Sequence, residues 1–283
     1  MNYYNEFDKN AAEWLRELIA EKLIPYGDVD ERSITDVRAD DLRGYTQCHF
    51  FAGIGGWSLA LQLAGWPEDR PVWTGSCPCQ PYSTAGKQQG NKDERDLWPE
   101  FFRLIKQCKP EFVFGEQVEN AIRHGWLDRV YSDLEGEAYT VGASVLGAHS
   151  VGAPHRRYRL YWGGVRVANR NVPRFQGRFS VECTNKPSRS CRVASFSPWR
   201  DSKFIFCRDG KTRRIPAESI LFSMVDGVSQ RVDRSRIDSI SEAEGFPITT
   251  QTEGRVMLLK GYGNAIVPQV ASEFIKAFID ILK

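Results

Sequence analysis

A strand that runs directly into a glycine-rich turn limits the folds this chain can adopt. The segment YTQCHFF at 45–51 has the pattern of a buried strand, and AGIGG at 52–56 follows it at once. SLALQLAGW at 58–66 then continues as a helix. In α/β proteins such a turn brings backbone amides and a helix N-terminus close to a ligand. Tight packing of the strand on the helix would explain the same glycines without a ligand.

Strand and helix patterns alternate through most of the remaining sequence. Alternation of this kind is typical of a parallel sheet with helices on both faces. We therefore predict an α/β fold with a doubly wound, mostly parallel sheet. Strands are expected at 71–76, 111–118, 139–148 and 158–164, and helices at 10–23, 97–108, 126–137 and 270–282.

Composition narrows the class of protein further. The 283 residues are 41% hydrophobic and 26% charged, and no run approaches the ~20 apolar residues of a membrane helix. The start, MNYYNEFDKN, has no basic region followed by an apolar stretch, so we expect no secretory or transit signal and a cytoplasmic location in a bacterium or phage-infected host. The seven cysteines form no paired CxxC units, so neither a zinc site nor a disulfide framework is expected.

Charge is distributed unevenly along the chain. The net charge is only +2, but basic residues concentrate between 156 and 215 and acidic residues crowd the first forty positions. From 165 to 236 the sequence is polar and irregular, which predicts a small second lobe. Arginines interleaved with aromatic residues there would contact phosphates and base edges. A basic, solvated insertion is the alternative.

Four residues are candidates for chemistry. Cys79 lies between two prolines in SCPCQPYS, where rigid flanks suit a nucleophile, although a lone loop cysteine is more often inert. Glu116 ends the apolar strand FVFG, where partial desolvation would raise its pKa as a general acid requires. Arg157 and Arg159 are two apart on an expected strand and would bind phosphate or carbonyl oxygens on one face. A solvated glutamate and a solvated strand face are the plain alternatives.

Six segments in order closely resemble the motif series of cytosine-5 DNA methyltransferases. They are FAGIGG at 51–56, PCQPYS at 78–83, GEQV at 115–118, PHRRYR at 154–159, EGFP at 244–247 and GNAIVPQVA at 263–271. The resemblance implies a Rossmann-like, S-adenosylmethionine-dependent methyltransferase fold. It implies a catalytic domain of 1–164 plus 237–283 and a target-recognition region at 165–236.

The resemblance also assigns roles to residues. Cys79 would add to C6 of a cytosine flipped out of duplex DNA, while Glu116 supports or protonates N3. Arg159 would orient Cys79 or the cytosine carbonyl, with Arg157 supporting both. Residues of the glycine loop and the last motif would bind the cofactor: Phe51, Ala52, Gly53, Gly55, Gly56, Asn264 and Ile266. Residues of the cysteine loop and the basic lobe would bind DNA: Gln80, Ser83, Arg174 and Arg178.

The chain departs from the family pattern in three places. Gln117 stands where the family usually has asparagine, and His155 where it usually has glutamine. Only about two dozen residues separate FAGIGG from PCQ, so two cofactor-binding strands of the family are missing there.

The amino terminus would supply the missing strands in a rearranged order. NEFDKNAAEWLREL resembles the family's second motif and DVDERSITDV its third. Glu6 would then bind the ribose hydroxyls, Phe7 would pack on the adenine, and Asp30 would reach the adenine amine unless Ser33 takes that position. The alternative is that residues 1–45 form an unrelated capping helix and leave the cofactor site incomplete.

Partners follow from the same resemblance. Duplex DNA is the expected substrate, a restriction endonuclease is a possible counterpart, and a monomer that does not contact membranes is expected. A catalytically impaired DNA-binding homologue and a tRNA cytosine-5 methyltransferase are the main alternatives. A dinucleotide oxidoreductase based on the glycine loop would leave PCQ unexplained.

Overall fold

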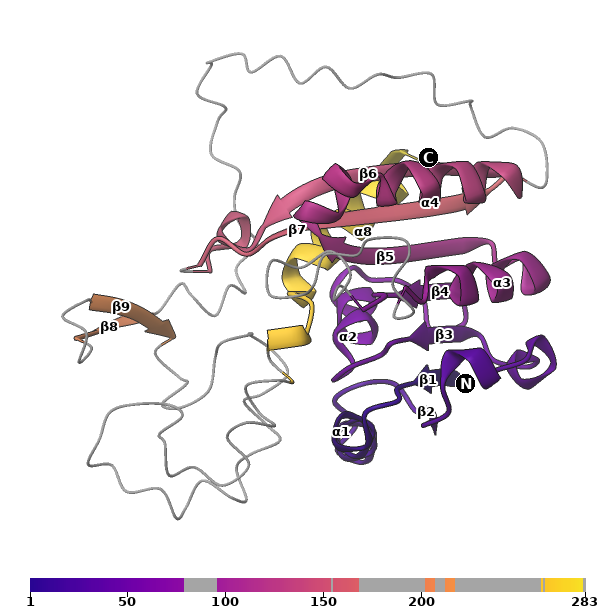
Figure 1. Ribbon diagram of the computed structural model, residues 1–283. Helices are drawn as coiled ribbons and strands as arrows, with labels where there is room; N and C mark the ends of the chain where they lie inside the picture. Colours follow the sequence, from indigo (N-terminus) through magenta and orange to yellow (C-terminus); the bar gives the residue numbers. More distant parts are fainter. Residues whose placement is uncertain are drawn as a thin grey trace.

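A seven-stranded mixed sheet forms the centre of the computed structural model, which describes residues 1–78, 96–153, 155–167, 202–206, 212–216, 261 and 263–281 (Figure 1). The strand order is β2-β1-β3-β4-β5-β7-β6, and only β7 runs antiparallel to its neighbours. This confirms the predicted α/β class with a mostly parallel sheet. The strands are β1 Asn2–Asn5, β2 Gly27–Asp30, β3 Gln47–Phe50, β4 Val72–Gly75, β5 Phe112–Val118, β6 Tyr139–Gly147 and β7 Tyr158–Arg166.

Helices cover both faces of the sheet. Buried side chains of α1, α2 and α8 pack on one face, and those of α3, α4 and the short helices η1 and η2 pack on the other. Asp8 begins α1, because its carboxylate accepts hydrogen bonds from the amides of Asn10 and Ala11. The bounds of the helices are α1 Lys9–Ala20, η1 Ile34–Asp36, η2 Ala39–Leu42, α2 Gly56–Leu63, α3 Trp98–Cys108, η4 Glu119–His124, α4 Trp126–Gly136, η5 Ala148–Val151 and α8 Pro268–Ile281.

The amino-terminal segment supplies two strands beside the strand that carries the glycine loop. β1 pairs in parallel with β3, with Asn5 opposite Phe50, and β2 pairs with the other edge of β1. The rearranged strand order predicted from the sequence is therefore present in the sheet. The alternative of an unrelated capping helix is wrong, because β1 and β2 are strands of the sheet. The amide of Glu6 continues their pairing by donating to the carbonyl of Asp30 at 3.0 Å.

The rearrangement has a consequence for chain handedness. α1 links β1 to β2 and α2 links β3 to β4. The first connection moves toward the edge strand β2, and the second moves in the opposite direction, toward the edge strand β6. Both helices nevertheless cover the same face, since Tyr4 of β1 contacts Ser58 of α2 and packs in one cluster with Leu15 of α1. The two crossovers therefore have opposite hands. One of them is an exception to the right-handed rule that about 98% of such connections obey.

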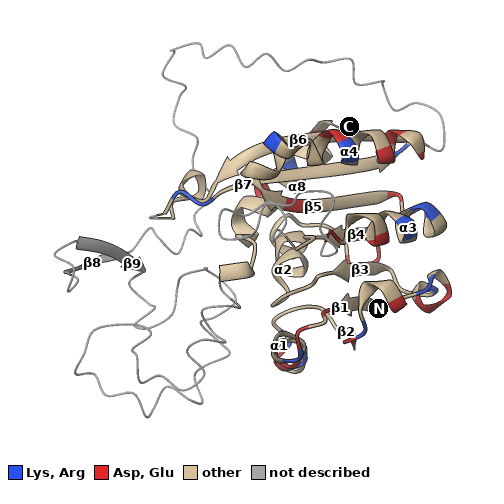
Figure 2. Ribbon diagram, viewed as in Figure 1, with Lys and Arg blue, Asp and Glu red and all other residues tan. Residues whose placement is uncertain are grey.

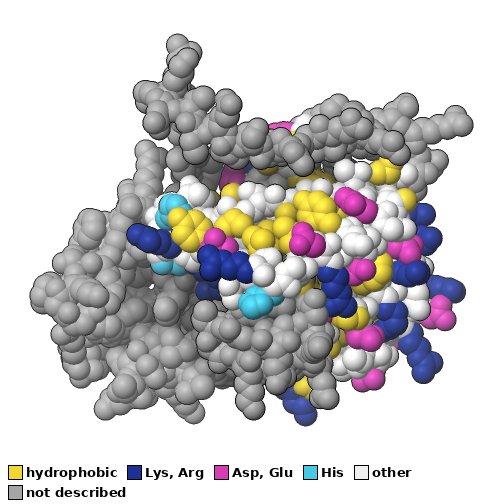
Figure 3. All heavy atoms as spheres, turned by 45° about the horizontal axis from the view of Figure 1, so that its top comes forward, with side chains coloured by type: hydrophobic (Ala, Val, Ile, Leu, Met, Phe, Trp, Pro, Cys, Tyr) yellow, Lys and Arg dark blue, Asp and Glu magenta, His cyan; other side chains and the backbone are white. Residues whose placement is uncertain are grey.

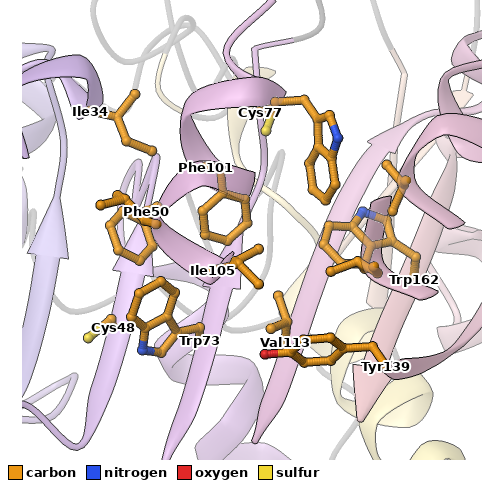
Figure 4. Packing of buried hydrophobic residues seen from close by; sticks show 14 of the residues in the cluster. Ile34, Cys48, Phe50, Trp73, Cys77, Phe101, Ile105, Val113, Tyr139 and Trp162 are labelled. Atoms are coloured by element: carbon orange, nitrogen blue, oxygen red, sulfur yellow. The ribbon is translucent and has the colours of Figure 1, made fainter. Parts of the chain in front are cut away.

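Aromatic side chains fill the core on the α3 and α4 face (Figure 4). The Trp98 ring meets those of Trp126 and Trp162 edge to face, with centroids 5.7 and 5.5 Å apart. Trp162 lies over Gly115, where an added Cβ would be 2.2 Å from the indole. Glycine is therefore required immediately before Glu116, and this packing holds the end of β5 in place.

The buried imidazole of His49 makes the free energy of unfolding depend on pH. It is 1% exposed, shares a 2.8 Å hydrogen bond with Thr74 and stacks on Tyr4. Burial lowers the pKa of His49 to about 3. An unfolded histidine titrates near 6.5, so the unfolded state takes up the proton first, and stability falls as the pH drops below about 6.5.

From pH 7 to pH 5 the native chain is expected to lose about 2 kcal/mol more of its free energy of unfolding than a His49→Gln variant. Urea unfolding at the two pH values measures this difference. Equal losses in both proteins would show that His49 is not held neutral.

Two further strands lie in the region expected to form the small lobe. β8 Ser202–Phe206 and β9 Thr212–Pro216 pair antiparallel with each other and not with the large sheet. The boundaries of this lobe stay a prediction. Among the described helices, none combines the length and apolar character needed to cross a membrane.

Candidate active site and cofactor cavity

A cavity of about 780 Å³ opens at the carboxyl ends of β1, β3, β4 and β5. Open α/β sheets bind their ligands at this edge. The cavity collects residues from eight separate stretches of sequence. Its lining includes Asn5 to Ala11, Trp14, Ser33, Ile34, Phe51 to Ile54, Gly56, Trp57, Ser76 to Pro78, Leu97, Glu116 to Val118, Arg159, Gly261 and Gly263 to Ile266.

The glycine loop forms one wall of the cavity. Gly53 and Gly55 have φ angles of 57° and 77°, which a residue with a side chain rarely adopts. A Cβ on Gly56 would approach Ile266 to 2.8 Å, so glycine lets the start of α2 pack against the last motif. Of the loop residues predicted to bind a cofactor, Phe51, Ala52, Gly53 and Gly56 line the cavity, whereas Gly55 shapes the turn.

The rearranged amino terminus reaches the same wall. One carboxylate oxygen of Glu6 accepts a 2.7 Å hydrogen bond from the amide of Gly53, and the other accepts from the amide of Asp8 at 2.8 Å. Phe7 lines the cavity with its side chain 73% exposed. Both predicted residues therefore lie where a ligand on the glycine loop would contact them.

Asp30 does not line the cavity, contrary to the first of the two assignments considered for this position. Its carboxylate pairs with Arg32 at 2.7 Å and accepts a 2.7 Å hydrogen bond from the Tyr3 hydroxyl. These contacts keep the Asp30 carboxylate beside Tyr3, whose ring packs in the core cluster on the α3 face of the sheet. Ser33 lines the cavity instead, as the second assignment proposed.

Glu116 and Arg159 form an ion pair at the β5 side of the cavity. Arg159 Nε lies 2.9 Å from Glu116 Oε1, and Glu116 is 8% exposed. Burial raises the pKa of the Glu116 carboxyl above its ordinary value, while the guanidiniums of Arg159 and Arg157 partly lower it. The raised pKa agrees with the expectation for a strand-end carboxylate. Glu116 therefore stays protonated to a higher pH than an exposed glutamate would.

Arg157 differs from its predicted position on a strand. β7 begins at Tyr158, and Arg157 precedes it with a φ angle of 33°. Figure 2 shows basic residues on this segment leading into β7. The Arg157 guanidinium donates to the carbonyls of Gly263 and Ala265 at 2.8 and 2.6 Å. It therefore fixes the turn that carries Asn264, which lines the cavity together with Ile266.

Gln117 holds the entry to the cysteine loop, a role that the sequence did not predict. The side chain is 1% exposed, and its Nε2 donates to the carbonyl of Cys77 at 3.4 Å. Its Oε1 accepts from the amide of Val118 at 2.9 Å. The indole of Trp57 similarly donates to Ser76 Oγ at 2.9 Å. The only sequence signal was the departure of Gln117 from the family's usual asparagine.

Several predicted site residues fall outside the described residues. They are Cys79, Gln80, Ser83, Arg174 and Arg178. Pro78, which immediately precedes Cys79, lines the cavity. His155, at the family's usual glutamine position, is half-buried, and burial together with the charge of Arg157 lowers its pKa.

The fold and the site define an α/β protein of the Rossmann-like class with a cavity of cofactor size at the sheet edge. The family model for the C-5 cytosine-specific DNA methylase matches residues 66–195. Over these residues the chain is similar to the cytosine-5 DNA methyltransferase family.

Two curated proteins and one solved structure are similar to the chain. The chain is 28% identical over 165 residues to Type II methyltransferase M.HhaI of Haemophilus parahaemolyticus, covering 44% of this chain and 50% of that protein. It is 29% identical to Type II methyltransferase M.PspPI of Psychrobacter sp. (strain TA137), covering 87% of this chain and 82% of that protein. Entamoeba histolytica methyltransferase EhMeth superposes with a TM-score of 0.49 at 16% identity, covering 100% of this chain and 99% of that one. The chain spans half the length of M.HhaI.

Proposed function

We propose that this protein transfers a methyl group from S-adenosylmethionine to C5 of a cytosine flipped out of duplex DNA. The observation that carries the proposal is the ion pair between buried Glu116 and partly buried Arg159, which shares one cavity with the glycine loop and with Pro78 beside Cys79. A carboxyl group with a raised pKa, a guanidinium and a thiol are the groups that this reaction needs at one place.

The proposed chemistry begins with the Cys79 thiolate. Its sulfur bonds to C6 of the ring, and the displaced electron pair passes to C5 while Glu116 donates a proton or a hydrogen bond at N3. When bound, S-adenosylmethionine would supply an electrophilic methyl group to the nucleophilic C5, and its S–CH3 bond would break to leave the neutral thioether. Loss of the C5 proton to a base and breakage of the C6–S bond then release 5-methylcytosine and free Cys79. Arg159 would hold the Glu116 carboxyl and the base in position relative to each other through these steps.

The described residues fit the cofactor. An adenosine group requires acceptors for its vicinal hydroxyls and an apolar surface for the purine, and the cavity offers the Glu6 carboxylate and the exposed Phe7 ring. The Gly53 amide already donates to Glu6, so the loop and the amino terminus would bind the ligand as one unit. Ser33, Asn264 and Ile266 would complete the pocket.

Removing the Glu6 carboxylate is expected to weaken cofactor binding. Glu6→Ala should raise the dissociation constant for S-adenosylmethionine by one to two orders of magnitude, or roughly 1.4 to 2.7 kcal/mol, because the ribose loses its acceptor and Gly53 loses its partner. Titration calorimetry measures the constant. Glu13→Ala is the matched control, because Glu13 lies on α1, is 66% exposed and does not line the cavity. An unchanged affinity in Glu6→Ala would remove Glu6 from the cofactor site.

Labelled methyl transfer tests the whole proposal. The full chain is incubated with tritiated S-adenosylmethionine and either mixed-sequence duplex DNA or transfer RNA. Label in DNA recovered as 5-methylcytosine supports the proposal, and label confined to RNA transfers it to a tRNA substrate. No label in either, with cofactor binding retained, would favour a catalytically impaired homologue. A restriction endonuclease counterpart and a monomeric state stay predictions.

A further inference from the structure

Exposed polar and aromatic side chains gather beside the mouth of the cavity. The strand registers place Gly147 of β6 opposite Tyr158, and Val118 of β5 opposite Arg159, so the ends of β5 and β6 meet the start of β7 at one edge. Tyr158 is 42% exposed, and its ring meets that of His149 at a centroid distance of 5.3 Å. Arg156 is exposed, and its carbonyl accepts from the amide of Ala148 at 2.8 Å.

The three arginines at this edge differ in their partners. Arg157 is bound to carbonyls of the last motif, and Arg159 is paired with Glu116. Arg156 makes no ion pair or side-chain hydrogen bond with the part of the chain that the structure describes. Figure 3 shows basic and histidine side chains gathered at one end of this face. Of the two described carboxylates at the end of β5, Glu116 is buried and Glu119, at the start of η4, is exposed.

We propose that His149, Arg156 and Tyr158 form a phosphate-binding patch for the DNA strand whose base enters the cavity. The inference rests on the proposed function, since it takes DNA as the ligand. Successive residues of a strand point to opposite faces, so Arg159 faces the cavity while Tyr158 lies on the other side of the same strand end. A nucleotide whose base reaches Glu116 would have its neighbouring phosphates at the strand end, within reach of an arginine, a phenol and an imidazole. These groups bind phosphate oxygens without reading sequence.

Salt dependence of DNA binding tests the patch in the full chain. Each phosphate contact in duplex DNA contributes about 0.9 to the slope of log K against log salt. Arg156→Gln is expected to reduce that slope by about 0.9 and to weaken binding to all duplex sequences equally. Tyr158→Phe, which removes only the hydroxyl, should weaken binding without changing the slope. The assay uses fluorescence anisotropy with a labelled mixed-sequence duplex.

Arg43→Gln is the matched control, because it removes the same charge from the chain. Arg43 precedes β3, at the amino ends of the parallel strands and therefore opposite the end of the sheet that holds the cavity, and its side chain is 82% exposed. A salt slope in Arg156→Gln equal to that in Arg43→Gln would overturn the proposed patch. A loss of affinity in Arg156→Gln that is seen with single-stranded RNA and not with duplex DNA would overturn it as well. The result is separate from the proposed function. A chain that binds DNA through this patch but transfers no methyl group would retain the inference and lose the activity.

Discussion

Glutamine in place of Glu116 is expected to lower kcat for DNA methylation by about two to three orders of magnitude. The amide keeps the shape of the side chain and can still donate a hydrogen bond, but it cannot transfer a proton to N3 and has no charge to pair with Arg159. Single-turnover methyl transfer with saturating cofactor and DNA measures the effect. Glu119→Gln is the matched control, because Glu119 is exposed on η4, three residues further along the chain. Activity in Glu116→Gln within threefold of Glu119→Gln would exclude Glu116 from the chemistry.

The dependence on pH separates an acid from a merely structural carboxylate. If protonated Glu116 is the active form, kcat falls as the pH rises through its pKa. Arg159 lowers that pKa, so Arg159→Ala should move the alkaline limb of the profile to higher pH while reducing the maximum rate. A limb that does not move would assign the pH dependence to another group. Thermal unfolding of Arg159→Ala, compared with the native chain, shows whether the buried Glu116 carboxyl is tolerated without its ion-pair partner.

Alanine in place of Cys79 is expected to abolish methyl transfer, with a loss of at least about a thousandfold, because the proposed bond to C6 is made by the Cys79 sulfur. DNA binding should remain close to that of the native chain, since the thiol contributes little to phosphate contacts. Gel filtration of the protein with DNA carrying 5-fluorocytosine reports the covalent adduct directly. The native chain should retain that DNA under denaturing conditions, and the variant should release it.

Cys77→Ala is the control that makes the test specific. Cys77 is two residues away and 6% exposed, and burial raises the pKa of its thiol. A buried thiol with a raised pKa supplies little thiolate, so this variant should keep most of the activity. Loss of activity in Cys77→Ala with retention in Cys79→Ala would reverse the assignment of the nucleophile.

Motif order and spacing determined much of the site. Local patterns located the glycine loop, Glu116 at the end of its strand and the two arginines, because strand ends and turns leave strong signals over a few residues. The unusually short gap between FAGIGG and PCQ also indicated that the amino terminus supplies the missing strands. The structure confirms their place in the sheet through the pairing of β1 with β3.

Contacts between distant segments left no such signal. Nothing near Gln117 in sequence indicates that its amide reaches Cys77, and nothing near Arg157 indicates the carbonyls around Asn264. The assignment of the third acidic position was open between Asp30 and Ser33, because a shift of a few residues at a strand end changes which side chain faces the cavity. Pairing with Arg32 and Tyr3 keeps Asp30 out of the cavity lining, so Ser33 is the residue that we propose for this position.

The sequence by itself determined the alternation of strands and helices and the rearranged order, and it gave the candidates for the chemistry-bearing residues, because each depends on neighbours along the chain. Only the tertiary structure decided that α1 and α2 cover one face, which the usual right-handed rule would place on opposite faces. The physical reason is that the face a helix covers depends on the packing of the whole sheet. The glycine loop must meet both Glu6 and Ile266, and that requirement joins residues from the two ends of the chain.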